Sequence, residues 1–340
     1  MIAGLRRLFA IGFACTAVLA SAAQARTPFT VDDVFQLGWV SSPLLDHRGD
    51  RVLYLRHSMD IMRDQPRSNL WRVNIDGSEH RPVTTGPDSI SSPALSPEGS
   101  RVAYVRRDDT GPQLFVSWLD SAQTAQLTRL PQAPASLVWS PDGKWLAFRM
   151  LVPAPAPTIG TLPRPPAGAQ WADAPEVVER MSYRTDGAGS KPHGYQHVFV
   201  LPADGGSPRQ VTTGNFHHSG NIAWSADAEA LYIVANRNPD WEQDTQNTDL
   251  YRVELGTGAI VALTDRRGPD TQVTVSPDGK LLAWVGWDDR GLGYHRHRLY
   301  VMGVDGGNRR ELLPDLDRNI QQPGWSTDGK RLLFYYDDRV

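Results

Sequence analysis

Cysteine is almost absent from this sequence of 340 residues. The single cysteine, Cys15, lies inside an apolar run from Leu8 to Ala23 near the amino terminus. A mature chain without that run would have no cysteine, so neither a disulfide nor a thiol nucleophile could contribute. A chain of this length can bury a sizeable hydrophobic core, and we expect its stability to come from that core.

Long runs of like charge are also absent. The sequence has 35 lysine and arginine residues against 38 aspartate and glutamate residues, and its formal net charge is −3. Recognition of nucleic acid or of an anionic membrane surface needs positive charge gathered on one face. We therefore expect no nucleic acid and, beyond export, no membrane as a partner.

The sequence also lacks a nucleophile elbow. The motif Gly-x-Ser-x-Gly places a reactive serine on a sharp strand-to-helix turn of α/β-hydrolases, and an aspartate and a histidine follow it along the chain. Ser207 has Gly205 two residues before it but Arg209 two residues after it, and no serine has glycine at both positions. The sequence therefore predicts no catalytic residue, and the chain alone is expected to be inactive.

Four of the nine histidines occur in two small groups. His217 and His218 are adjacent, and His295 and His297 lie in the segment 294–298. A zinc site needs three or four converging ligands, and these groups are far apart in the sequence. We interpret them as solvated hairpin tips and predict neither a metal nor a cofactor, although a neutral imidazole can be a ligand.

The amino terminus has the pattern of a secretory signal. Arg6 and Arg7 precede the apolar run, which ends in the small-residue sequence Ala23-Gln24-Ala25. The run is marginal for spanning a bilayer, which takes roughly 20 apolar residues. We expect a cleaved signal peptide over residues 1–25 and a periplasmic or extracellular location. The alternative is an uncleaved amino-terminal anchor.

A repeated unit of turn and strand is the strongest signal in the rest of the chain. Each full copy has Ser-Pro-Asp-Gly or a close variant before a short apolar strand, as at 281–285 and 332–335. In that turn proline presets φ, aspartate can bond the following backbone, and glycine supplies the left-handed residue. We expect structural turn roles for Ser96, Gly99, Ser140, Asp142, Gly143, Ser276, Asp278, Gly279, Asp328 and Gly329.

The spacing of the unit indicates the fold. Measured from the serine of each turn, with Asp46 in the degenerate first copy, the intervals are 50, 44, 85, 51 and 50 residues. A second half-repeat with an Asp-Gly hairpin turn, as at 204–206, falls between the copies. About four short strands in a period of roughly 40–50 residues are typical of a β-propeller, whereas a β-helix repeats over a much shorter length.

We therefore predict an all-β fold, a propeller of four-stranded antiparallel blades with five units plus the start of a sixth and an incomplete ring. The partial propeller is expected over residues 26–340, and the sixth unit begins at Trp325. Because that unit stops after one strand, we expect the chain to be a fragment of a longer protein. The tryptophans at strand ends, Trp139, Trp224 and Trp325, are interpreted as packing between blades.

The interval of 85 residues holds an insertion, which we place at 152–195. Its first part, 152–175, contains seven prolines and cannot continue a central strand. We interpret it as an extended loop of polyproline character. A surface excursion is favoured, because long insertions cost little loop entropy. The alternative is a loop that reaches a substrate channel or a partner domain.

The order of these pieces resembles the propeller of the prolyl oligopeptidase family of serine peptidases, especially its acylaminoacyl-peptidase and dipeptidyl aminopeptidase branches. The opening segment 29–35 resembles the start of that propeller, and the segments 183–206 and 235–240 resemble its acylaminoacyl branch. In that family the propeller precedes an α/β-hydrolase domain and restricts access to it. The resemblance implies a substrate-gating fragment of a secreted peptidase acting on peptides, with the catalytic domain absent from this sequence.

The resemblance also suggests a binding role for acidic residues. Some members of the family hold the amino terminus of a peptide with propeller carboxylates, and Glu242 and Asp244 are the candidates here. Two other functions remain open. One is a non-enzymatic periplasmic scaffold or binding propeller of the TolB type, and the other is a lactonase-type propeller hydrolase, which would need a metal cluster. Oligomeric state stays undetermined.

Overall fold

The computed structural model describes residues 28–161, 163–172 and 175–338. The signal peptide expected over residues 1–25 lies outside the described residues. A 3-10 helix, η1 (Val31–Gln36), opens the described chain. Its start is capped because the backbone N–H and the hydroxyl of Thr30 both donate to the Asp33 carboxylate, at 2.7 and 2.9 Å. No helix within the described ranges is long and apolar enough to cross a membrane.

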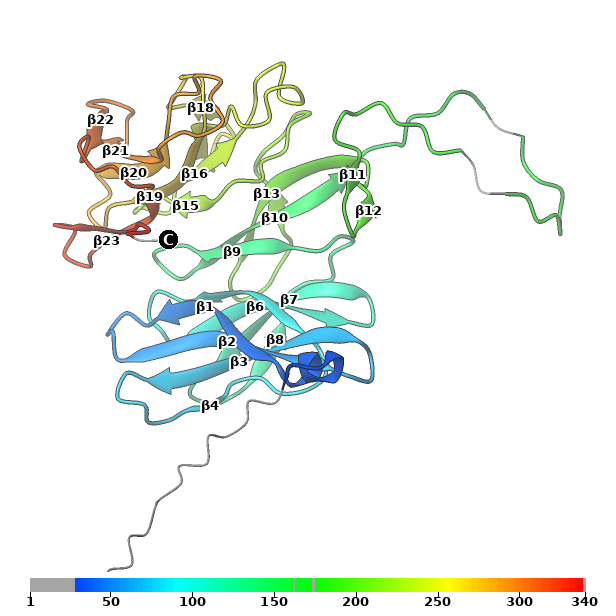
Figure 1. The fold of residues 1–340 in the computed structure, drawn as a ribbon, viewed down its shortest axis with the longest axis horizontal. Helices are drawn as coiled ribbons and strands as arrows, with labels where there is room; N and C mark the ends of the chain where they lie inside the picture. Colours follow the sequence, from blue (N-terminus) through cyan, green and yellow to red (C-terminus); the bar gives the residue numbers. More distant parts are fainter. Residues whose placement is uncertain (1–27, 162, 173–174, 339–340) are drawn as a thin grey trace, which may run out of the picture.

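Five four-stranded antiparallel sheets follow one another along the chain (Figure 1). The strands of blade 1 are β1 (Gly38–Leu45), β2 (Arg51–Asp60), β3 (Gln65–Asn74) and β4 (Arg81–Pro82). Those of blade 2 are β5 (Ile90–Leu95), β6 (Arg101–Asp108), β7 (Gly111–Trp118) and β8 (Thr124–Gln126). Those of blade 3 are β9 (Ala135–Trp139), β10 (Trp145–Pro153), β13 (Gly194–Pro202) and β14 (Arg209–Gln210).

Blades 4 and 5 repeat the same strand order. Blade 4 contains β15 (Ile222–Trp224), β16 (Ala230–Ala235), β17 (Asp249–Glu254) and β18 (Ile260–Ala262). Blade 5 contains β19 (Asp270–Val275), β20 (Leu281–Gly286), β21 (Arg298–Gly303) and β22 (Arg310–Leu312). A two-stranded sheet of β23 (Gln321–Trp325) and β24 (Leu332–Tyr335) comes last. The prediction of an all-β fold with five units and the start of a sixth is confirmed.

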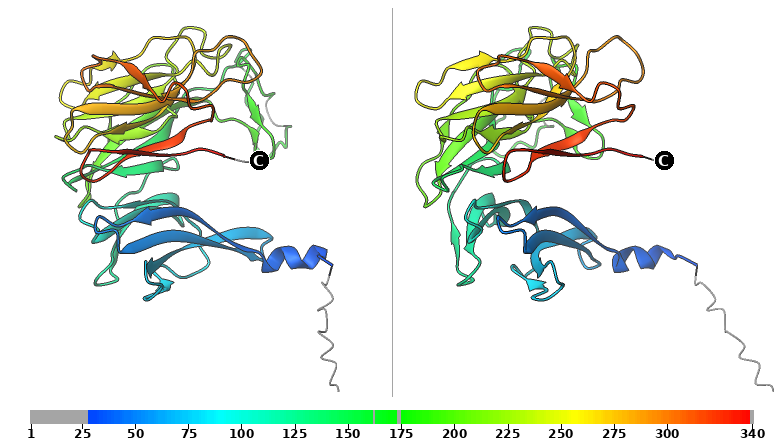
Figure 2. Two further views of the ribbon diagram at one scale, coloured as in Figure 1. Left: turned by 60° about the vertical axis from the view of Figure 1, so that its left-hand side comes forward. Right: turned by 90° about the vertical axis from the view of Figure 1, so that its left-hand side faces the viewer.

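The sheets are arranged around a common axis. The first strands of successive sheets, β1, β5, β9, β15, β19 and β23, each contact the next one. Figure 2 shows β1 and β2 at one end of the resulting arc and β23 and β24 at the other end. Apolar cores lie between neighbouring blades, as where Leu114 and Val116 of blade 2 pack with Leu146 and Phe148 of blade 3. Burial of each such side chain stabilises the fold by roughly 1.5–3 kcal/mol.

Tryptophan indoles join the blades, as their positions at strand ends predict. Trp139 Nε1 donates to the carbonyl of Ala94 in blade 2 at 2.9 Å, and Trp224 Nε1 donates to the carbonyl of Val138 in blade 3 at 3.2 Å. Both side chains are buried. The apolar ring fills the space between two sheets while its N–H is satisfied.

The Ser-Pro-Asp-Gly segments form compact turns between the first and second strands of the blades. In blade 3 the Ser140 hydroxyl donates to Asp142 Oδ1 at 2.6 Å, and the backbone N–H of Lys144 donates to the same oxygen at 3.1 Å. The N–H of Trp145 donates to Ser140 Oγ at 2.9 Å, and Gly143 has φ +69°. The same bonds recur at the turns of Ser276 and Ser326.

The opposite ends of these strands carry the connections between second and third strands, and their lengths divide the blades into two groups. In blades 1 and 2 the connections are short, 61–64 and 109–110. In blades 3, 4 and 5 they are long, 154–193, 236–248 and 287–297. The first of the long ones includes the small hairpin of β11 (Arg184–Thr185) and β12 (Gly189–Ser190) and extends away from blade 3 (Figure 1). We call these three segments the long connections.

Candidate functional site

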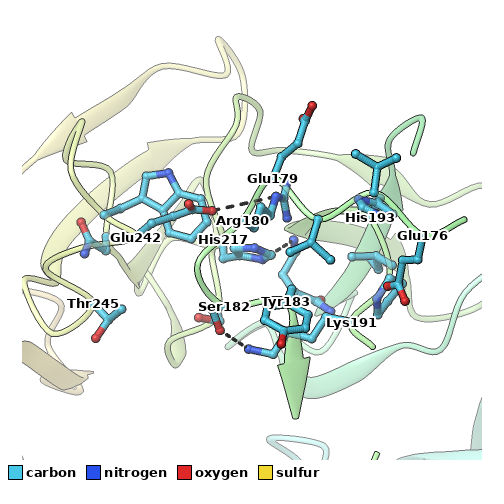
Figure 3. Close-up of a pocket in the computed structure, with 18 of the residues that line it drawn as sticks. Glu176, Glu179, Arg180, Ser182, Tyr183, Lys191, His193, His217, Glu242 and Thr245 are labelled. Atoms are coloured by element: carbon cyan, nitrogen blue, oxygen red, sulfur yellow. Dashed lines mark hydrogen bonds and ion pairs between the residues drawn. The ribbon is translucent and has the colours of Figure 1, made fainter. Parts of the chain in front are cut away.

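A cavity of about 440 Å³ lies between blades 3 and 4, and we call it the blade 3–4 pocket. One wall comes from the second part of the insertion, 176–193, and the other comes from the long connection 236–248. His217, in the segment between β14 and β15, also lines it (Figure 3). The second part of the insertion, for which no separate role was predicted, thus forms a pocket wall.

Arg180 is held in place at one side of the pocket. Its guanidinium lies 4.4 Å from the ring centroid of Tyr195, and its Nη1 donates to the carbonyl of Gly194 at 3.1 Å. Arg180 Nε lies 4.0 Å from Glu242 Oε1 across the pocket (Figure 3). That separation is too long for a hydrogen bond, so the two charges attract each other without direct contact.

The two acidic candidates face different surroundings. The side chain of Glu242 is 20% exposed and lines the blade 3–4 pocket. Within the described residues, Arg180 is the one group that pairs with the Glu242 carboxylate. Asp244 lines a separate groove on the outer side of blade 4, where its carboxylate lies 3.6 Å from Arg267 Nε. Of the candidates, only Glu242 reaches the pocket.

Two further charged groups of the pocket are bonded to hydroxyls of the insertion. Lys191 Nζ donates to Ser182 Oγ, and the Ser190 hydroxyl donates to Glu176 Oε2 at 3.0 Å. These bonds hold the pocket wall in its fold. Glu179 lines the pocket as well, so Glu242 and Arg180 are the pair that face each other among five charged lining residues.

His217 is a neutral donor at the base of the pocket. Its Nδ1 accepts the backbone N–H of Gln196 at 3.2 Å, and its ring lies 5.3 Å from those of Tyr195 and Trp241. Burial, with the charges of Arg180 and Lys191, lowers the pKa of His217 to about 4. The proton of the neutral ring is therefore on Nε2.

His218 is buried behind it, with 1% of its surface exposed. Its Nε2 accepts a bond from Arg237 Nη1 at 2.6 Å, and its Nδ1 donates to the carbonyl of Gln196 at 3.2 Å. Burial and the Arg237 charge lower the pKa of His218 to about 3. The prediction of solvated hairpin tips is wrong for this pair, because Arg237 and the backbone of β13 take the place of water.

We expect acid to destabilise the fold through His218. The pKa in the fold lies below the ordinary value of about 6.5, so the unfolded chain binds more protons between about pH 6.5 and pH 3. Stability is full above this window and falls on acidification. His218→Gln, whose amide can keep both hydrogen bonds, should reduce the fall between pH 6 and 4 by about 1.4 kcal/mol per pH unit.

Urea unfolding of both proteins at pH 4, 5, 6 and 7.5 measures this difference. At pH 7.5 the histidine is neutral in both folded and unfolded chains, so that comparison isolates the packing effect of the substitution. Equal slopes for the two proteins would contradict the assignment of His218 as a buried neutral imidazole.

The second histidine group also differs from the prediction of a solvated tip. The ring of His297 is stacked on Trp287, with centroids 4.1 Å apart, and His295 accepts the backbone N–H of Arg290 on Nε2 at 3.0 Å. In the part of the chain that the structure describes, no group of three or more histidine, cysteine, aspartate or glutamate side chains could hold a metal ion.

Sequence reasoning did not identify the pocket, because its members come from separate segments. Arg180, His217 and Trp241 converge only through the long connections and the β14–β15 segment. One signal was available in the spacing of the repeats. The interval of 85 residues indicates that the connection in blade 3 is long enough to form a pocket wall.

Comparison with known proteins agrees with this architecture. Residues 170–285 match the family described as the dipeptidyl peptidase IV N-terminal region. Dipeptidyl-peptidase 5 of Porphyromonas gingivalis is 22% identical over 314 residues, which are 88% of this chain and 44% of that protein. The chain thus spans less than half the length of that relative.

Solved structures share the fold at lower identity. Acylaminoacyl peptidase from Pyrococcus horikoshii superposes with a TM-score of 0.65 and 15% identity, over 89% of this chain and 43% of that one. The propeller domain of the trilobed protease from Pyrococcus furiosus, described as having an open velcro topology, gives a TM-score of 0.58 at 14% identity, over 89% of this chain and 79% of that one. The chain is a β-propeller related to the propeller portions of peptidases of the prolyl oligopeptidase family.

Proposed function

We propose that this chain is the substrate-gating propeller of a secreted serine peptidase of the prolyl oligopeptidase family, and that its blade 3–4 pocket binds the amino terminus of a peptide. The matching family model describes the N-terminal region of a dipeptidyl peptidase, and the relative dipeptidyl-peptidase 5 is named as a peptidase. This chain matches the propeller portions of such proteins. The three long connections gather on one face of the propeller, where they can restrict what reaches a catalytic domain placed there.

The single observation that carries the proposal is the Glu242 carboxylate. It is four-fifths buried, and its partner Arg180 is 4.0 Å away. A peptide ammonium could donate hydrogen bonds to this carboxylate, and charge-assisted bonds of this kind are among the stronger ones. Trp241 also lines the pocket, and its ring adds a face that attracts a cation.

The neighbouring donors suit the rest of a peptide terminus. The Nε2–H of neutral His217 and the guanidinium of Arg180 can both donate to the first carbonyl oxygen. The pKa of His217 is about 4, so its ring is neutral at pH 7 and does not repel an ammonium group bound at Glu242. The pocket therefore offers the Glu242 carboxylate as an acceptor for an ammonium, together with two donors for a carbonyl.

Binding of matched peptides by the full chain tests this function. Tri-alanine amide with a free amino terminus should bind about tenfold more tightly than its N-acetylated form at pH 7, since charge-assisted bonds contribute about 1.5–3 kcal/mol. Glu242→Gln should abolish that preference. Isothermal titration calorimetry measures both affinities.

Asp244→Asn is the matched control, because it removes a carboxylate two residues away that faces another groove. It should leave the preference for the free amine unchanged. Equal affinities of the free and acetylated peptides for the unmodified chain would argue against an amine site, and so would loss of the preference in Asp244→Asn alone.

A further inference from the structure

A second cavity, of about 590 Å³, lies between blades 4 and 5 on the same face, and we call it the blade 4–5 pocket. Its walls are the long connection 287–297 and the strand start at Thr271. The two pockets adjoin. Thr248 lines both of them, and Thr245 of the first is followed in the chain by Gln246 of the second.

The blade 4–5 pocket differs from its neighbour in charge. None of the described residues that line it is a carboxylate, a lysine or an arginine. Its base is the stacked pair of Trp287 and His297, whose planes are 5° apart. Burial lowers the pKa of His297, so this imidazole stays neutral and presents a flat aromatic surface.

The outer wall of the pocket is formed by Leu292 and Tyr294. Leu292 is 61% exposed and Tyr294 is 69% exposed. The Tyr294 hydroxyl donates to Asn319 Oδ1 at 3.3 Å, and the backbone N–H of His297 donates to the same oxygen at 3.0 Å. This oxygen therefore ties the wall and the base of the pocket to the segment before β23.

We infer that the blade 4–5 pocket binds an aromatic side chain of the peptide whose amino terminus occupies the blade 3–4 pocket. A cavity lined by no carboxylate, lysine or arginine, with stacked aromatic rings and an apolar wall, favours a planar apolar group, which gains both burial and ring contact. An amine, by contrast, is expected to bind at Glu242 in the neighbouring blade 3–4 pocket. Because this assignment rests on the proposed function, each pocket needs a probe of its own.

N-acetyl-phenylalanine amide probes the blade 4–5 pocket alone, since it has a ring and no amine. Saturation-transfer NMR with the full chain should show contact with its ring protons. The signal should fall at least fivefold in Trp287→Leu and in Tyr294→Ala and persist in Glu242→Gln. Tyr294→Ala changes a largely exposed ring, so it keeps the test valid if Trp287→Leu does not fold.

Trp171→Leu is the control, because Trp171 is an exposed tryptophan of the insertion that lines neither pocket. It should leave the signal unchanged. Absence of ring contact with the unmodified chain, or contact that survives both pocket variants, would overturn the inference whatever happens at Glu242.

Penta-alanine amide and four derivatives, each with one phenylalanine at positions 2 to 5, test the link between the pockets. One derivative should bind about tenfold more tightly than penta-alanine amide, and Tyr294→Ala should remove that gain. Glu242→Gln should weaken all five peptides alike. A phenylalanine gain without a free-amine preference would refute the amine site while retaining the aromatic one. An amine preference with no phenylalanine gain would overturn the present inference alone.

Discussion

Replacing Asp270 by alanine is expected to lower the free energy of unfolding by about 3–5 kcal/mol. Asp270 is fully buried at the start of β19, where its carboxylate pairs with Arg266 and accepts the Trp284 Nε1–H at 2.8 Å. Burial raises the pKa of Asp270, and the Arg266 charge opposes that rise. Without the carboxylate, the Trp284 N–H would lose its partner, and the mostly buried Arg266 guanidinium would keep the longer contacts with Asp288 at 3.5 Å and with the Pro269 carbonyl at 3.4 Å.

Urea unfolding at pH 7, followed by circular dichroism, measures this loss. Asp265→Ala serves as the control, because Asp265 is 91% exposed and lies 3.8 Å from Arg309 in a surface ion pair. Such a pair contributes about 0–1 kcal/mol. If the two alanine variants were equally stable, the Asp270 carboxylate would not stabilise the buried Arg266 guanidinium.

Gly194→Ala is expected to have an effect of similar size, about 4 kcal/mol. Gly194 opens β13 opposite Pro153 with φ +133°, and an added Cβ would lie 2.2 Å from the carbonyl oxygen of Val152. Backbone strain of this kind costs about 1–3 kcal/mol, and forced overpacking adds about 1–3 kcal/mol. Since Arg180 bonds the carbonyl of Gly194, the amine preference of the blade 3–4 pocket should fall with it.

Gly187→Ala separates the cost of backbone strain from the cost of the close contact with Val152. Gly187 also has a positive φ, +75°, but an added Cβ there would meet nothing within 4 Å. We expect a loss of about 1 kcal/mol from the backbone conformation alone. Denaturant unfolding gives the stabilities, and titration with tri-alanine amide gives the affinities. Equal losses for the two variants would show that the contact with Val152 is relieved by movement of the strand.

The fold could be predicted because its information is local. The turn at Ser140 needs only six consecutive residues to make its bonds, and the same motif returns at Ser276 and, with threonine in place of proline, at Ser326. Strand pairing within a blade follows from these turns and from the hairpin turns that contain Asp-Gly. The five four-stranded units and the start of a sixth within this sequence then follow from counting copies.

The candidate site could be predicted only in part, because its information is not local. The acidic segment 241–244 was identified, but nothing in its sequence says that Glu242 faces a pocket while Asp244 faces Arg267. His218 lies in a polar segment that looks solvated, and its burial depends on Arg237 from another blade. Contacts of this kind follow no period, so no repeat pattern can reveal them.

The ends of the long connections have a consequence for engineering. Each connection begins and ends next to two residues paired across neighbouring strands, Pro153 with Gly194, Ala235 with Asp249 and Gly286 with Arg298. The scaffold thus presents each segment from two anchor points at a fixed separation, as an antibody domain presents its hypervariable loops. Segments of unrelated length could be exchanged between propellers at these anchors, so ligand preference could diversify while the blades stay unchanged.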